Sequence, residues 1–274
     1  MVPHANELQA EFGERGFQII GVTGANEPKD KTEQWIADKG AEYAYSYSAD
    51  AGGALGVRGI PHGVLVDPFG RIVWRGHPSR LGADEIEKAI EGALPTPLWD
   101  WPESTSKVQE QIRSANWAGA HAAAKELRDK DLGKSISGFI AKSATMKVEG
   151  VTASYEDGDI LGATEAIAAL GDSLKGLEAG RALATLAEKI AKDKGAQKTL
   201  ELQQQVAGYS SLVPQSREQF EEMMEDKEGT MASLEEAIGE LETIAKEYSG
   251  KYVARQAEAM LEELEPFLEY LKGE

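Results

Sequence analysis

The histidines and acidic residues are the side chains of this sequence that could support acid–base or metal chemistry. The four histidines are His4, His62, His77 and His121, and no two of them have the short spacing that metal ligands use. The sequence contains no cysteine, which excludes disulfides, thiolate nucleophiles and thiolate-bound metals within these 274 residues. We therefore predict that this chain carries no catalytic residue, no metal ligand and no cofactor.

The stretch DGDILGATE, residues 157–165, has some features of a calcium-binding loop. Two aspartates and a glycine fit that pattern. However, Leu161 and Ala168 stand at the fifth and twelfth positions, where the loop needs oxygen ligands. An aspartate before a helical segment is more typical of an N-cap, so we assign that role to Asp157 or Asp159.

The charge of the chain limits its partners. Asp and Glu number 47 against 29 Lys and Arg, which gives a formal net charge of −18. Nucleic acid binding needs a cationic surface, so we expect no nucleic acid partner. No run reaches the roughly 18 apolar residues that cross a bilayer, so we expect no membrane span in this chain.

Residues 1–95 alternate between helical and strand patterns. Short apolar runs bounded by Gly, Pro and Asp predict strands at 17–23, 63–67 and 71–75, and the sequence DPFGR between the last two predicts a hairpin turn. Apolar residues at helical spacing predict helices before, between and after these strands. This order is typical of an α/β domain.

Beyond residue 95 the pattern changes. Residues 96–104 form a linker rich in proline and tryptophan, and residues 105–274 read as an all-helical domain. Near its end, Ser233 with Glu236 suggests a capping box and Gly250 a stop, so we expect an antiparallel helical hairpin there. Weakly repeated segments resemble degenerate hairpins of the tetratricopeptide class, although their spacing is irregular. The segments are 119–127, 162–170 and 233–241.

Three ordered segments carry a resemblance to a known family. They are VPHANELQAEFGERGFQIIGV, then GALGVRGIPHGVLVDPFGRIVWRGHP, then ADEIEKAIEGAL. Together they resemble the thioredoxin-like redoxin superfamily, and within it the TlpA-type branch of disulfide reductases. The resemblance covers about a third of the chain, residues 1–95, and implies a thioredoxin-like α/β fold.

The resemblance implies a substrate site but not its redox centre. Pro61 matches the family's cis proline, so we expect Gly59, Ile60, Pro61 and His62 to bind an extended protein or peptide substrate. The family's Cys-x-x-Cys motif would lie a few residues before Pro3, upstream of Met1. We therefore expect an N-terminally truncated domain that lacks this motif and the strand before it. In the family that strand is central, between the strands matching 17–23 and 63–67.

Two functions follow from these expectations. By resemblance the protein is a thiol–disulfide oxidoreductase, inactive as given because the redox cysteines are absent. The alternative is a non-catalytic thioredoxin-fold module that binds peptides or proteins, with a helical scaffold that has a protein partner of its own. The family resemblance also suggests an extracytoplasmic or periplasmic location, which no residue of this chain demonstrates.

Overall fold

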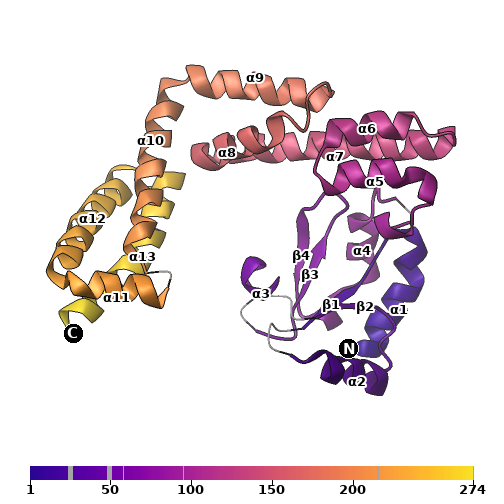
Figure 1. The fold of residues 1–274 in the computed structure, drawn as a ribbon, viewed down its shortest axis with the longest axis horizontal. Helices are drawn as coiled ribbons and strands as arrows, with labels where there is room; N and C mark the ends of the chain where they lie inside the picture. Colours follow the sequence, from indigo (N-terminus) through magenta and orange to yellow (C-terminus); the bar gives the residue numbers. More distant parts are fainter. Residues whose placement is uncertain (24–26, 48–50, 58, 95, 215, 274) are drawn as a thin grey trace. The chain divides into compact units, whose positions relative to one another are not determined.

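The computed structural model describes residues 1–274 except for 24–26, 48–50, 58, 95, 215 and 274 (Figure 1). The chain divides into two compact units, Met1–Met146 and Lys147–Glu274, which are described separately below. The described residues are mostly helical, and the strands among them all lie in the first unit. The domain boundaries expected from the sequence, with a linker at 96–104, stay a prediction.

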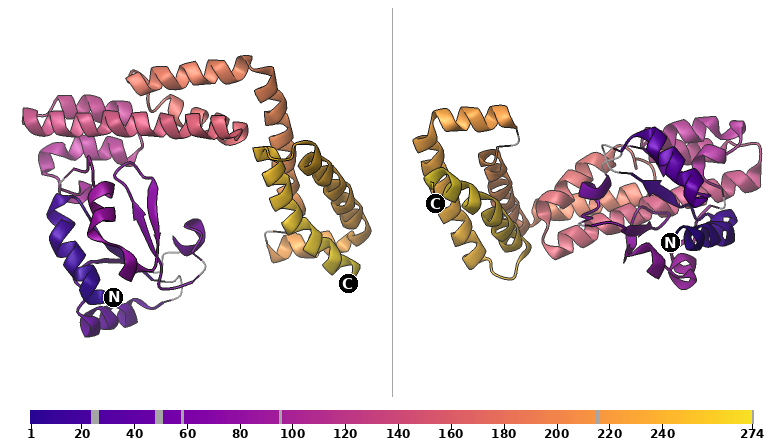
Figure 2. Two further views of the ribbon diagram at one scale, coloured as in Figure 1. Left: turned by 180° about the vertical axis from the view of Figure 1, so that it is seen from behind. Right: turned by 90° about the horizontal axis from the view of Figure 1, so that it is seen from below.

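The first unit starts with alternating helices and strands and continues with helices (Figures 1 and 2). In chain order its elements are α1 (Val2–Phe12), η1 (Gly13–Arg15), β1 (Ile20–Val22), α2 (Lys29–Lys39), β2 (Ala44–Ser46), α3 (Ala51–Ala54), β3 (Gly63–Val66), β4 (Ile72–Gly76), η2 (Pro78–Arg80), α4 (Ala83–Ala89), η3 (Leu98–Asp100), η4 (Glu103–Thr105), α5 (Ser106–Arg113), α6 (Trp117–Lys125) and α7 (Lys130–Asp157), which contains the boundary between the units.

The strands form two separate two-stranded sheets. β1 pairs in parallel with β2, with Ile20 opposite Ala44, and β3 pairs antiparallel with β4. Within the described ranges, no strand joins β1–β2 to β3–β4. The three strands expected from the sequence are therefore present. The structure shows a mostly helical chain with two small sheets. The thioredoxin-like assignment stays a proposal.

The core of the strand-containing region lies between α1, β3 and α4. Its buried side chains come from both helices, from the approach to β1 and from β3, and Trp74 of β4 packs against them. They are Leu8, Phe12, Phe17, Leu65, Ile86 and Ala89. Because apolar residues four apart lie on one face of a helix, Leu8 and Phe12 point together into this cluster.

A second core in the first unit is entirely helical. It is formed by buried residues of α5, α6 and α7, with Trp101 from the proline-rich segment packed against it. These residues are Val108, Ala120, Ala123, Ala124, Leu127, Ile136 and Ile140. The three alanines leave little side chain between α6 and its neighbours, which lets the helices approach closely.

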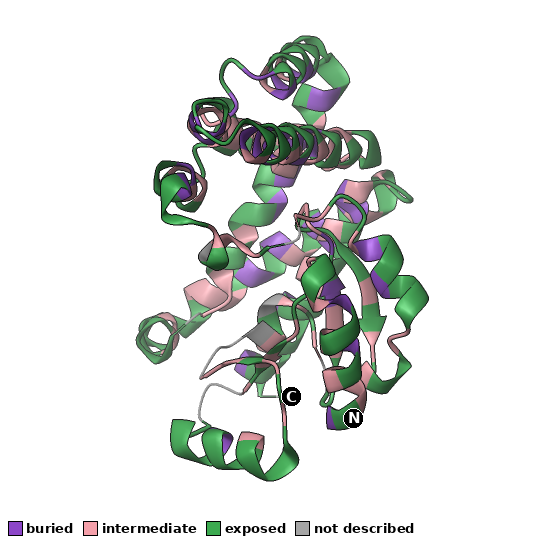
Figure 3. Ribbon diagram, turned by 90° about the vertical axis from the view of Figure 1, so that its right-hand side faces the viewer, coloured by how far each residue is buried: buried purple, intermediate pink, exposed green. Residues whose placement is uncertain are grey.

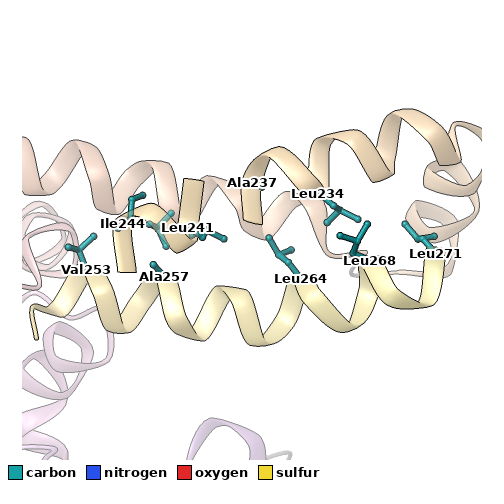
Figure 4. Packing of buried hydrophobic residues seen from close by; sticks show 10 residues of the cluster. Leu234, Ala237, Leu241, Ile244, Val253, Ala257, Leu264, Leu268 and Leu271 are labelled. Carbon is teal, nitrogen blue, oxygen red and sulfur yellow. The ribbon is translucent and has the colours of Figure 1, made fainter. Parts of the chain in front are cut away.

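The second unit is helical throughout its described residues. After the end of α7 it consists of α8 (Ile160–Gly171), α9 (Glu178–Lys192), α10 (Lys194–Gly208), η5 (Tyr209–Leu212), α11 (Arg217–Glu225), α12 (Lys227–Glu247) and α13 (Tyr252–Lys272). α12 and α13 lie side by side with their buried leucines facing one another (Figure 4). The expected helical hairpin is confirmed, with buried residues on both of its helices. Figure 3 colours the chain by burial and shows buried segments on several helices.

One expected helix start is wrong. Ser233 lies inside α12, where its hydroxyl donates to the Gly229 carbonyl oxygen, and does not form a capping box. The helix begins at Lys227, and its N-cap is Asp226, whose carboxylate accepts from the Gly229 N–H at 3.1 Å. Aspartate caps a helix as well as serine does, so the earlier start satisfies the same free N–H groups.

Candidate functional site

The expected substrate-binding residues form an exposed loop directly before β3. Gly59, Ile60, Pro61 and His62 are all exposed, and the Ile60 side chain is 92% accessible. The Ile60–Pro61 peptide bond is cis, which is the geometry expected from the resemblance. Binding of a substrate by these four residues stays a prediction.

The segment before the loop is hydrogen-bonded to the β3–β4 sheet. Arg75 of β4 donates from its guanidinium to the Leu55 carbonyl oxygen, just after α3. Between Leu55 and the loop, Gly56 has a φ of +64°, a left-handed conformation that favours glycine. These contacts hold the chain before the loop close to β4.

The end of the loop is fixed by close packing around Gly63. A Cβ added to Gly63 would lie 3.2 Å from the Trp74 ring and 3.4 Å from Pro78. The contact with Trp74 is tighter than ordinary packing, so glycine at this position allows the indole ring to cover the start of β3. Trp74 in turn packs against the buried cluster that contains Leu65.

Asp67 closes the β3–β4 hairpin. Its Oδ1 accepts from the N–H groups of Phe69 and Arg71, each at 2.9 Å, and its Oδ2 accepts from the Arg71 guanidinium at 2.7 Å. Burial raises the pKa of the Asp67 carboxyl, but the hydrogen bonds from Arg71 and Phe69 outweigh it and hold the pKa below 3.8. The hairpin expected at DPFGR is therefore confirmed, with a buried carboxylate at its centre.

α1 positions both β1 and the approach to β2 by side-chain hydrogen bonds. Gln9 accepts from the Ile19 N–H at 2.7 Å and donates to the Phe17 carbonyl oxygen at 3.3 Å. Asn6 donates to the Gly40 carbonyl oxygen at 2.7 Å and accepts from the Glu42 N–H at 3.0 Å. These amides satisfy backbone groups that lie outside the strand ladders.

An aromatic cluster covers one face of β1 and β2. The Tyr45 ring stacks on Tyr43 and meets Trp35 of α2 edge-on, and it lies where a Cβ of Gly21 would stand. Burial, with a hydrogen bond to Tyr43, raises the pKa of Tyr45 well above its usual value of 10.0.

The structure does not bring the histidines together. His4 bonds the Leu81 carbonyl oxygen, His77 bonds Ser79, and His62 is exposed in the loop. Among the described residues, no group of three or more histidine or acidic side chains is placed to hold a metal ion.

The aspartates of the stretch at 157–165 have structural roles. Asp159 is the N-cap of α8 and accepts from the Gly162 N–H at 3.0 Å, which confirms the capping interpretation. Asp157 forms an ion pair with Arg255 at 2.7 Å.

Four apolar residues that the two sheets leave accessible lie where the resemblance implies an absent central strand, between the strands at 17–23 and 63–67. The side chains of Ile20, Val22 and Val66 are about half exposed, and Val64 is partly buried. Only the separation of the two sheets shows that nothing in the described chain covers them.

None of the described helices has the length and apolar character needed to cross a bilayer. Comparisons with protein-family models, with curated proteins and with solved structures found no significant match for this chain.

Proposed function

We propose that residues 1–95 are a thioredoxin-like domain that binds extended polypeptides at the loop Gly59–His62. In thiol–disulfide oxidoreductases of this type, such a loop holds the substrate beside the redox cysteines. These 274 residues contain no cysteine, so the chain provides substrate docking and performs no thiol chemistry itself.

The observation that carries the proposal is the exposure of Ile60. The Ile60 side chain is 92% accessible, and Gly59, Pro61 and His62 beside it are exposed as well, so a bound polypeptide can cover the four residues together. The loop leads directly into β3, so a bound peptide can pair with backbone groups there while its side chains contact Ile60 and Pro61.

The electrostatics of the loop favour an uncharged or mildly polar segment. Gly59, Ile60 and Pro61 carry no ionisable side chain, and His62 is the only ionisable side chain among the four loop residues. Recognition therefore depends on backbone pairing and apolar contact, which suits unfolded polypeptides of varied sequence.

Binding of an unfolded polypeptide tests the proposal. The probe is fluorescein-labelled insulin B chain, reduced and blocked with iodoacetamide, titrated with the full chain and followed by anisotropy. Burying one isoleucine contributes about 1.5–3 kcal/mol, so Ile60→Ser should weaken binding about 10- to 100-fold. The matched control is Met224→Ser, which removes an exposed apolar side chain from the second unit.

Equal affinity of wild type and Ile60→Ser, with unchanged circular dichroism, would contradict docking at this loop. A separate assay addresses the chemistry. The 274-residue chain should not accelerate reduction of insulin disulfides by dithiothreitol, because it has no thiol to exchange. Measurable acceleration would show that the chain acts by another route.

A further inference from the structure

An exposed apolar surface lies where α11 crosses the C-terminal part of α13 (Figures 1 and 2). The centre of the Phe220 ring on α11 is 6.3 Å from that of Phe267 and 6.0 Å from that of Tyr270, both on α13. Met224 follows Phe220 by four residues, so the two side chains share one face of α11. We call these four residues the aromatic patch.

The aromatic patch is open to solvent. Tyr270 is 62% exposed and Met224 is 37% exposed, whereas Leu268 and Leu271 beside Tyr270 are buried in the α12–α13 core. All nine residues of α11 are described, and none of them is buried. Apolar side chains that gather on a surface and are bordered by charged residues are typical of interaction sites.

The charges around the aromatic patch are mostly negative. α11 has one arginine and four glutamates, and the arginine, Arg217, pairs with Glu221 at 2.8 Å. On α13, Glu263 is exposed and precedes Phe267 by about one turn on the same helix face. Lys272, the last basic residue of α13, pairs with a glutamate of α12 at 2.8 Å. This surface therefore complements a partner that carries positive charge beside its apolar side chains, and it repels nucleic acids and anionic membranes.

The chemistry of the patch also limits the form of the partner. A second copy of the chain is a poor occupant, because the chain has a formal net charge of −18 and a symmetric contact would bring the same glutamates together. α11 and α13 are helices that bond their backbone groups internally, so they offer no strand edge to a partner. A polypeptide that covers the patch must satisfy its own backbone groups, and a helix does so.

We propose that the aromatic patch binds a basic amphipathic helix of another protein. The apolar side chains of that helix cover Tyr270 and Met224, and its lysines or arginines lie against Glu263 and the glutamates of α11. Aromatic rings and a methionine suit this role, because they provide large contact area, cation–π contacts and adaptable packing. The site lies in the second unit, so it does not depend on the function proposed for residues 1–95.

Fluorescence anisotropy with designed peptides tests the proposal on the unmodified chain. The probe is fluorescein-labelled KLLKKLLKKLLKKL, which places leucines and lysines on opposite sides of a helix, titrated with the full chain. One control peptide has the same composition in a scrambled order that gives no apolar face. A second control keeps the leucines and has glutamate in place of every lysine. We expect the probe to bind at least about tenfold more tightly than either control peptide.

Variants of the chain locate the site. Tyr270→Ser should weaken binding of the probe about tenfold, and Met224→Ser about three- to tenfold, because tyrosine is often the residue that contributes most to an interface. Ile60→Ser should leave this binding unchanged, which is the reverse of the pattern expected at the loop. Glu263→Lys should weaken binding about three- to tenfold, and Glu110→Lys is the matched control, since it makes the same change of net charge at an exposed site in the first unit.

Several results would overturn the proposal. Equal affinity for the probe and the scrambled peptide would show attraction by charge alone, and preference for the acidic peptide would show the wrong sign of charge. Unchanged affinity of both serine variants, with circular dichroism like that of wild type, would place the binding elsewhere. Self-association of the chain in analytical ultracentrifugation that Tyr270→Ser abolishes would identify a second copy as the occupant.

Discussion

Replacing Asp67 tests how the β3–β4 hairpin is held next to the proposed loop. The Asp67→Asn variant keeps an oxygen that can accept from the Phe69 and Arg71 N–H groups. It replaces Oδ2 by an NH2 group, which cannot accept from the Arg71 guanidinium. The variant thus removes one charge-assisted hydrogen bond and leaves the backbone turn intact.

The expected cost follows from the exposure of the two partners. The Asp67 side chain is 4% exposed but that of Arg71 is 56% exposed, so solvent screens part of the attraction. We expect Asp67→Asn to lower the free energy of unfolding by about 1–2 kcal/mol, and Asp67→Ala, which loses all three bonds, by about 3–4 kcal/mol.

The effect should depend on pH in a defined direction. The pKa of the Asp67 carboxyl is held below 3.8 in the folded state, so its ionised form stabilises the fold above pH 3.8. This contribution is lost as the pH falls through the folded-state pKa. The difference between wild type and Asp67→Asn should therefore be largest at neutral pH and shrink below about pH 4.

Urea unfolding followed by tryptophan fluorescence measures this in the first unit, because all five tryptophans lie there. Asp38→Asn, at an exposed site on α2, is the control and should change stability by no more than about 0.5 kcal/mol. An Asp67→Asn variant as stable as wild type at pH 7, or a difference that grows towards low pH, would refute the reasoning.

Three further predictions concern single residues. Gln203 is fully buried, accepts from the Leu161 N–H and donates to the Gly158 carbonyl oxygen. Gln203→Leu should therefore destabilise the second unit by about 2–4 kcal/mol, measured by urea unfolding followed by circular dichroism. Gln204→Leu, at an exposed position, is the control and should not have this effect. Tyr45 should stay neutral at pH values where ordinary tyrosines ionise. The absorbance titrations of wild type and Tyr45→Phe at 295 nm, which follow tyrosine ionisation, should therefore coincide through pH 10. A step near pH 10 that is lost in the variant would contradict the burial of Tyr45. Pro266 lies exposed inside α13, so Pro266→Ala should stabilise the second unit by about 1–3 kcal/mol, and unchanged or lower stability would count against a normal helix there.

Local sequence signals predicted most of the elements. Leu8 and Phe12 at helical spacing, with Gly13 after them, indicated α1, and Gly40 ended α2 in the left-handed conformation expected of such a stop. The sequence DPFGR identified the hairpin because aspartate and glycine favour a tight turn. These signals act within a few residues, so one sequence suffices to read them.

The start of α12 could not be read from its local pattern. Ser233 and Glu236 fit a capping box, yet Asp226 provides an equally good cap about two turns earlier, and the residues between them tolerate helix. Where two caps compete, tertiary packing decides, here through Met231, which packs against the α12–α13 core.

The candidate site was predicted only in part. The loop Gly59–His62 was located through the resemblance, in which Pro61 matches the family's cis proline, and the Ile60–Pro61 bond is cis in the structure. The local apolar runs do not predict the exposure of Ile20 and Val66, whereas the absent central strand that the resemblance implies between 17–23 and 63–67 fits it. Their exposure depends on which strands pair, and pairing joins residues far apart in sequence.

The central claim is that β1 and β3 each have an open edge, and residue-resolved hydrogen–deuterium exchange tests it most directly. The amide protons of Val22 and Val66, which point to the open edges, should exchange faster than those of Gly21 and Leu65, which face β2 and β4. Equal protection of neighbouring residues in the free chain would contradict the claim, because both edges of each strand would then already be paired.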